Sequence, residues 1–149
     1  MKVRVGAVQM ISHKGEAQAN ITKALDLCDR AAKRGVKMLC FPECASTGFD
    51  WLKDERATEL VYAEAVPGPM VEAFADKARE ADMYIIFGMV ERPRNAKKIY
   101  NTAFLVGPQE GYIGRYRKIY SESVFEDGTD ADVFDTRFGK VRIFICADM

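Results

Sequence analysis

The sequence predicts an α/β fold, with a mixed β-sheet and helices packed on at least one of its faces. In the first part of the chain, short apolar segments alternate with amphipathic ones, a pattern typical of strand, helix, strand crossovers. In the second part, apolar segments follow one another across short polar turns, which indicates antiparallel hairpins. The 149 residues, of which 48% are hydrophobic, predict one domain, residues 1–149, with a sizeable core.

The first crossover is predicted between residues 3 and 42. Apolar side chains alternate along 3–9, which indicates a strand. Apolar residues then recur at helical spacing from 16 to 34, and Gly35 follows a basic last turn as a helix C-cap. Residues 36–41 form a short apolar strand that Pro42 ends.

The remaining elements are one helix and a series of strands. The helix follows the turn Pro67-Gly68-Pro69 and presents an apolar face over 70–81. Strands are predicted at 83–90, 99–106, 111–120, 133–136 and 141–145. The total is about six or seven strands and two helices. The chain stops four residues after the last strand, where a covering element would normally follow, so we expect it to be part of a larger fold.

Composition excludes several classes of function. The 22 Lys and Arg residues balance 22 Asp and Glu residues, which argues against a nucleic-acid or anionic-membrane binder. The longest apolar run, 84–90, is too short to span a membrane, and the N-terminus lacks the apolar stretch of a signal peptide. Four cysteines in such a chain are expected to stay reduced, so we predict a cytoplasmic protein.

His13 is the single histidine, which excludes a multi-histidine metal site. A general base is therefore expected to be a carboxylate, a lysine or a tyrosine. The segment from Cys40 to Cys44 has the wrong spacing for a zinc knuckle and lacks a second cysteine pair, so no metal is predicted.

Three reactive residues follow or end predicted strands, where mixed sheets present side chains to a crevice. Glu43 follows Pro42 and is either solvated in the loop, which is favoured when it is taken alone, or held near the sheet edge with a raised pKa. Lys118 lies in the predicted strand 111–120, where alternation puts it on one face with Tyr112, Gly114 and Tyr116, and Arg115 and Arg117 on the other. Taken alone, this lysine fits an edge strand protected by positive charge.

Cys146 ends an apolar run at a strand-to-loop corner, where backbone N–H groups can point at a substrate. The alternative is a buried, inert thiol, since free cysteine is among the most buried residue types. That alternative suits Cys28 and Cys40 better, because they lie on an apolar helix face and in an apolar strand. Cys44 stays ambiguous as the neighbour of Glu43.

These segments, taken in order, resemble the nitrilase, or carbon–nitrogen hydrolase, superfamily. The segments are GAVQM (6–10), the asparagine-bearing helix, FPECASTGF (41–49), the Pro-Gly-Pro turn, YNTAFLVGPQEGYIGRYRK (100–118), VFDT (133–136) and ICADM (145–149). The resemblance implies a catalytic triad of Glu43, Lys118 and Cys146. It also implies a second glutamate, for which Glu122 is the better candidate and Glu126 the alternative.

The resemblance further implies a chemistry without cofactor or metal. Lys118 would favour the Cys146 thiolate, and Glu43 would act as general base and acid. Lys118 and the N–H of Ala147 would hold the oxyanion, and Glu122 would position the substrate or orient Lys118. The intermediate would be a thioester acyl-enzyme that water releases.

Cys146-Ala147-Asp148 is closer to the pattern of amidases and carbamoylases than to the Cys-Trp-Glu of many nitrile-cleaving members. The expected substrate is therefore a small amide or N-carbamoyl compound, with water as co-substrate and with a nitrile as the alternative. The resemblance implies the N-terminal part of an α-β-β-α four-layer sandwich and a homo-oligomer. If the chain were complete, we would expect an exposed apolar sheet face that associates, and an inactive remnant or interaction module becomes the competing hypothesis.

Overall fold

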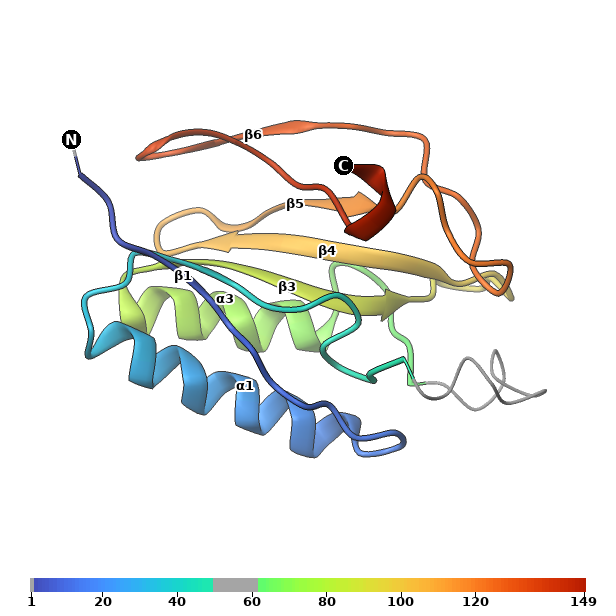
Figure 1. Ribbon diagram of the computed structural model, residues 1–149, viewed down its shortest axis with the longest axis horizontal. Helices are drawn as coiled ribbons and strands as arrows, with labels where there is room; N and C mark the ends of the chain where they lie inside the picture. The colour runs from blue at the N-terminus through green and yellow to red at the C-terminus, as the bar shows by residue number, and fades with distance from the viewer. Residues whose placement is uncertain (1, 50–61) are drawn as a thin grey trace.

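The computed structural model describes residues 2–49 and 62–149. It contains a five-stranded sheet in the order β1-β2-β3-β4-β5, two helices on one face, and a separate two-stranded hairpin over part of the other face (Figure 1). The elements are β1 (Val5–Ala7), α1 (Ala17–Ala32), β2 (Met38–Cys40), α3 (Pro69–Ala81), β3 (Tyr84–Glu91), β4 (Tyr100–Gly107), β5 (Gly111–Arg117), β6 (Val133–Thr136), β7 (Gly139–Arg142) and a 3-10 turn at Cys146–Asp148. The predicted α/β mixed sheet is confirmed.

Strand direction decides which residues share an edge of the sheet. Strands β1, β2 and β3 are parallel, as the crossover pattern predicts, and β3, β4 and β5 are antiparallel neighbours. Strands β2, β3 and β5 therefore end at the same edge, where β4 begins. The segments that follow β2 and β5 both leave the sheet at this edge.

The main core lies between the sheet and the two helices. The ring of Phe74 on α3 packs on Phe87 of β3 with centroids 4.3 Å apart, and Phe104 of β4 completes the group at 5.7 Å from Phe74. All three are fully buried, and burying a side chain of this size contributes about 2 kcal/mol. Gly35 ends the α1 region in a left-handed conformation (φ 73°), which glycine adopts without steric cost.

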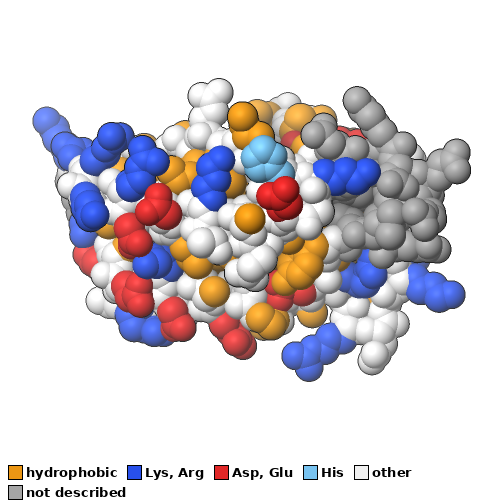
Figure 2. Space-filling model, turned by 90° about the horizontal axis from the view of Figure 1, so that it is seen from below, with side chains coloured by type: hydrophobic (Ala, Val, Ile, Leu, Met, Phe, Trp, Pro, Cys, Tyr) orange, Lys and Arg blue, Asp and Glu red, His pale blue; other side chains and the backbone are white. Residues whose placement is uncertain are grey.

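The outer face of the helix layer is mixed in charge. Figure 2 shows Lys and Arg side chains interspersed with Asp and Glu side chains over this face. Lys77 of α3 bridges to Asp29 of α1 at 3.0 Å and to Glu80 at 2.9 Å, so part of this charge joins the two helices. Among the described residues, no helix combines the length and apolarity needed to cross a membrane.

Two expectations for the strands are wrong in detail. The last strand ends at Arg142 and not at residue 145, because β7 pairs only with the four residues of β6. Ile143 and Ile145 instead bury their side chains under the hairpin, whereas Phe144 is 44% exposed. Residues 143–145 thus form a segment that leads out of the hairpin toward Cys146.

A bulge in β5 changes the face of Tyr112. The register between β4 and β5 shifts at Leu105 and Val106, so that Leu105 pairs with Gly114 and Val106 pairs with Tyr112. Tyr112 consequently packs against the helix-side core, while Tyr116 packs under the hairpin. The strict alternation expected from the sequence fails because one extra residue in the strand reverses the side of everything before it.

The hairpin covers the sheet unevenly. Phe134 of β6 packs on Gly114 of β5, where a Cβ atom would lie 2.3 Å from the ring. At the opposite edge, Val5 of β1 is 64% exposed, and Ala7 and Cys40 are also exposed. An apolar strip along β1 and β2 therefore stays open to solvent in the described part of the chain.

Candidate active site

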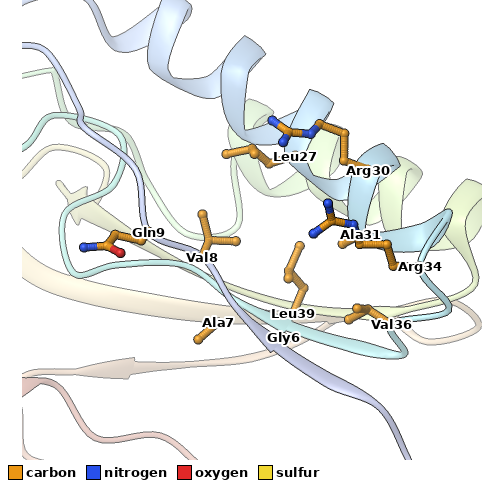
Figure 3. Close-up of a pocket in the computed structure, with 10 residues that line it drawn as sticks. All are labelled: Gly6, Ala7, Val8, Gln9, Leu27, Arg30, Ala31, Arg34, Val36 and Leu39. Atoms are coloured by element: carbon orange, nitrogen blue, oxygen red, sulfur yellow. The ribbon is translucent and has the colours of Figure 1, made fainter.

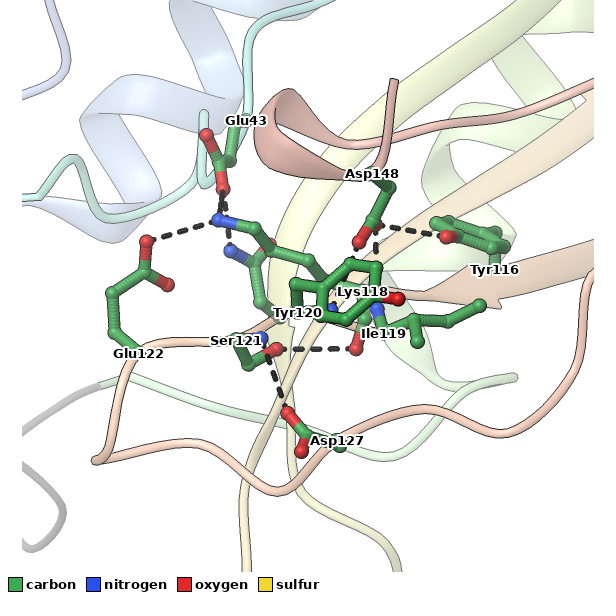
Figure 4. A network of polar contacts seen from close by, with 10 residues as sticks. Glu43, Tyr116, Lys118, Ile119, Tyr120, Ser121, Glu122, Asp127 and Asp148 are labelled. Atoms are coloured by element: carbon green, nitrogen blue, oxygen red, sulfur yellow. Dashed lines mark hydrogen bonds and ion pairs between the residues drawn. The ribbon is translucent and has the colours of Figure 1, made fainter.

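The shared edge of the sheet brings Glu43 and Lys118 together (Figure 4), and Asn101 of β4 joins them there. The Lys118 ammonium lies 2.9 Å from Glu43 Oε1, and the Asn101 amide donates to the same oxygen at 2.7 Å. Lys118 also donates its backbone N–H to the carbonyl of Asn101 at 2.9 Å. A side-chain hydrogen bond thus joins Glu43 to Lys118, 75 positions apart in the sequence, and a backbone hydrogen bond fixes Lys118 to Asn101.

Lys118 is a buried cation between two carboxylates. Its side chain is 1% exposed, and its ammonium lies 2.9 Å from both Glu43 Oε1 and Glu122 Oε1. Burial lowers the pKa of Lys118, but the hydrogen bonds and the negative charges of the two glutamates outweigh it, so its pKa lies above the ordinary value. Lys118 is therefore a permanent positive charge in this site.

Glu43 reaches Lys118 because the segment after β2 crosses over β3 at a glycine. A Cβ atom on Gly88 would lie 2.4 Å from the carbonyl oxygen of Pro42 and 3.0 Å from the Cα atom of Glu43. The absence of a side chain at Gly88 lets the two backbones touch. Cys44 then adopts a left-handed conformation (φ 48°) that turns the chain away from the sheet.

The structure separates the two candidates for the second glutamate. Glu122 contacts Lys118, whereas Glu126 lies 2.8 Å from the ammonium of the exposed Lys98. The turn after Lys118 also places the N–H of Gly128 on the Lys118 carbonyl at 2.7 Å. Of the two, only Glu122 has a described contact with Lys118.

Cys146 and Glu43 line the same pocket, which has a volume of about 110 Å³. Small residues of the sheet, Gly88 and Ala103, form part of its wall, with Phe144 at the side of the cysteine. Cys146 is exposed and has a positive φ of 50°, which is unusual for a residue with a side chain. The pocket thus joins the segment after β2 to the turn after β7.

The other three cysteines have less reactive surroundings. Burial raises the pKa of Cys28 to about 12 and also raises the pKa of Cys44, where the charges of Glu43 and Glu122 add to the effect. The pKa of Cys40 is raised by desolvation as well, although its side chain reaches the surface. Because the thiolate is the nucleophile, these shifts disfavour reaction at all three.

Asn101 and Gly88 are site residues that the sequence reasoning missed. Asn101 is fully buried in β4, where a polar amide among apolar residues was the signal that could have found it. Gly88 interrupts an otherwise apolar strand, a position that often marks a close approach of another backbone. The sequence gives no indication of which segment makes that approach.

A second pocket lies away from this site, between the outer edge of β1 and α1 (Figure 3). It has a volume of about 210 Å³, an apolar floor that includes Val36 and Leu39, and Arg30 and Arg34 on the helix side. None of the predicted catalytic residues lines it. Within the described residues, no cluster of three or more His, Cys, Asp or Glu side chains is arranged to hold a metal ion.

Comparison with known proteins agrees with the resemblance seen in the motifs. Residues 4–149 match the family described as carbon-nitrogen hydrolase. The chain belongs to this family. It is 36% identical over 152 residues to a nitrilase of Pyrococcus abyssi (strain GE5 / Orsay), with 98% of the chain and 56% of that relative covered. It is 30% identical over 145 residues to the omega-amidase NIT2 of Mus musculus, with 87% of the chain and 50% of that relative covered.

A solved structure with a similar fold is a variant of the amidase from Nesterenkonia sp. AN1. It carries the acetamide moiety of fluoroacetamide added covalently at its active site cysteine. The TM-score is 0.79 at 17% sequence identity, with 98% of this chain and 56% of the amidase covered, so the likeness concerns the fold. The chain thus spans about half the length of the relatives it matches and forms part of the nitrilase fold.

Proposed function

We propose that this chain carries the catalytic residues of a hydrolase that cleaves small amides or N-carbamoyl compounds through a thioester acyl-enzyme. The observation that carries the proposal is the buried Lys118 ammonium between Glu43 and Glu122, beside a pocket that Glu43 shares with Cys146. This arrangement supplies a carboxylate and a thiol at one small cavity, with a fixed positive charge paired with the carboxylate. Histidine is not required, since a carboxylate serves as the base.

In the first half of the reaction, Glu43 removes the proton from the Cys146 thiol, and the sulfur attacks the substrate carbonyl carbon. The oxyanion that forms is held by Lys118 and by the backbone N–H of Ala147, which has no acceptor among the described hydrogen bonds. One such donor is typically worth about 3 kcal/mol of transition-state stabilisation. Glu43 then returns its proton to the nitrogen of the leaving ammonia or amine as the carbon–nitrogen bond breaks.

In the second half, water attacks the thioester. Glu43 accepts a proton from this water and passes it to the sulfur as the carbon–sulfur bond breaks, so the acid product leaves with the Glu43 carboxylate and the Cys146 thiol restored. Glu43 suits these repeated transfers because only its Oε1 atom is hydrogen-bonded to Lys118 and Asn101. Glu122 would hold Lys118 from its other side and contact the substrate.

The preference for amides over nitriles rests on the Cys146-Ala147-Asp148 sequence and on the kinship to an omega-amidase. Because the chain is also similar to a nitrilase, the substrate test includes nitriles. A panel of small amides, N-carbamoyl amino acids and aliphatic nitriles, assayed by ammonia release, should give turnover of the first or second class. Turnover of nitriles alone would refute the proposed substrate class.

The site itself is tested by cysteine alkylation in the native chain, read at each cysteine by peptide mass. Cys146 should react selectively with iodoacetamide well below pH 8, and Lys118→Ala should abolish this selectivity. Cys40 is the matched control, because it is the other exposed cysteine. An ordinary thiol pH dependence for Cys146 that Lys118→Ala leaves unchanged would favour an inactive remnant or interaction module.

A further inference from the structure

Asp148 lies two residues after Cys146, in the same 3-10 turn. It connects this turn to β5, the strand that leads to Lys118. We propose that Asp148 is a positioning residue that clamps the Cys146 turn onto the end of β5. The inference deepens the proposed function and rests on it, since the clamp fixes where the nucleophile stands relative to Lys118. No step of the reaction described above uses Asp148 itself.

The Asp148 carboxylate accepts three hydrogen bonds from residues on both sides of Lys118 (Figure 4). Its Oδ2 atom accepts the hydroxyl of Tyr116 at 2.8 Å and the N–H of Ile119 at 3.3 Å. Its Oδ1 atom accepts the N–H of Tyr120 at 2.9 Å. Asp148 is therefore hydrogen-bonded to the chain on both sides of Lys118, where the chain leaves the sheet.

These are the hydrogen bonds that tie the turn to the five-stranded sheet in the described part of the chain. The other two described for the turn stay inside its own segment, from the N–H of Asp148 to the carbonyl of Ile145 and from the N–H of Met149 to the carbonyl of Cys146. Packing of Ile143 and Ile145 under the hairpin holds the segment on its other side. Loss of the Asp148 carboxylate would leave the turn held by packing alone.

The backbone of Cys146 supplies an independent reason for a clamp. With φ at 50°, Cys146 lies in the left-handed region, which is unfavourable for a residue with a side chain and persists where the surrounding contacts impose it. Cys146 is exposed, so few contacts of its own hold this conformation. The anchor at Asp148 lies within the same 3-10 turn and supplies that restraint.

Chemistry favours a carboxylate over an amide at this position. Both carboxylate oxygens accept, whereas an asparagine would turn an N–H₂ group toward either Tyr120 or the Tyr116 and Ile119 donors. Burial, reinforced by Asp148, raises the pKa of Tyr116 to about 12, so the tyrosine hydroxyl stays protonated and donates at neutral pH. The three donors and the two acceptor atoms are thus matched.

The test compares Asp148→Asn and Tyr116→Phe with the control Asp135→Asn, which changes an exposed carboxylate paired with Lys140 on the hairpin. The measurement is the iodoacetamide labelling rate of Cys146 relative to Cys40 across about pH 6 to 9. Near pH 7 we expect this ratio to fall about tenfold in Asp148→Asn and about threefold in Tyr116→Phe. The labelling profile of Cys146 should also move to higher pH, and Asp135→Asn should change neither.

The outcomes separate the clamp from the proposed function. A wild-type Cys146 that labels selectively below pH 8, with a profile that both variants leave unchanged, would overturn the clamp and keep the proposed function. A lower melting temperature with that unchanged profile would show a purely structural role and would also overturn it. An ordinary thiol profile for Cys146 in the wild type would overturn the proposed function and the clamp's catalytic role together. If Asp148→Asn fails to fold, Tyr116→Phe decides, because it removes one hydroxyl group.

Discussion

Glu43 and Glu91 both pair with cationic side chains at the same edge of the sheet. They differ in how many of their carboxylate oxygens are hydrogen-bonded. Glu91 ends β3 on the helix side of the sheet and is 1% exposed. Arg117 donates to both of its oxygens, at 2.6 Å and 2.9 Å, and Thr102 adds a hydroxyl at 2.9 Å. Arg115 lies 3.2 Å from the same carboxylate, so Glu91 has no acceptor atom left for chemistry.

Glu43 lies on the other face and keeps one oxygen available. Lys118 and Asn101 both bond to Oε1, and Oε2 has no partner among the described hydrogen bonds. Its side chain is 20% exposed and borders the pocket of Cys146. Arg117 and Lys118 are sequence neighbours, so strand alternation alone sends one cation to each carboxylate. A fully bonded carboxylate stabilises the fold, whereas one with a free oxygen beside a cavity can exchange protons.

The largest expected effect is that of Glu43→Gln on catalysis. The amide cannot accept the thiol proton, so hydrolysis should fall by at least about 10³-fold. The melting temperature should change by less than about 3 °C, because the side chain keeps its shape and part of its hydrogen bonding. Ammonia release and calorimetry measure the two quantities. A large loss of stability with a modest loss of activity would contradict this prediction, because it would give Glu43 the stabilising role assigned to Glu91.

Glu91→Gln should show the opposite profile. Removing the charge leaves two partly buried arginines without their partner, and breaking such a pair costs about 3 kcal/mol. Denaturant unfolding should register this loss, while selective labelling of Cys146 should persist in the folded protein. Thr102→Val, which removes only the hydroxyl donor, should cost about 1 kcal/mol. Loss of Cys146 selectivity in Glu91→Gln would show that the two clusters are coupled across the sheet.

Gly88→Ala should displace the segment that carries Glu43. The new methyl group would overlap the carbonyl oxygen of Pro42, and overpacking of this kind costs about 1 to 3 kcal/mol. Because a small misplacement of a catalytic group is costly, turnover should fall about tenfold or more. The matched control is Gly114→Ala, which meets the ring of Phe134 on the same face but away from Glu43. Equal effects of the two variants on turnover would contradict the role of Gly88.

The smallest expected effect is that of Asp82, a carboxylate that also pairs with cations but is 54% exposed. Hydrogen bonds from Arg137 and Lys37 lower its pKa from 3.8 to about 2. The charged form is therefore favoured in the fold, so its stabilisation is complete above about pH 4 and is lost as the pH falls toward 2. The stability difference between wild type and Asp82→Asn should be small at neutral pH and absent near pH 2. A difference that stays constant with pH would contradict this assignment.

The order of segments, the α/β class and the positions of most elements follow from the sequence. Hydrophobic periodicity places the two helices and the long strands β3 and β4, because burial against one core repeats at the period of each element. The catalytic roles expected of Glu43, Lys118 and Cys146 come from the family resemblance of the motifs around them, since the residues taken alone favour a solvated carboxylate and an edge-strand lysine. The burial predicted for Cys28 on α1 is confirmed, whereas Cys40 of β2, for which the sequence also favours a buried thiol, is exposed.

Only the tertiary structure decided the contacts between these segments. The bulge that turns Tyr112 to the helix side depends on the pairing of β4 with β5, which no local pattern specifies. The crossing at Gly88, the amide of Asn101 on Glu43 and the choice of Glu122 over Glu126 each depend on distances between residues far apart in the chain. Hydrophobic periodicity indicates which face of a helix or strand is buried. Hydrogen bonds across the sheet depend also on strand register and on where segments cross, and tertiary packing determines both.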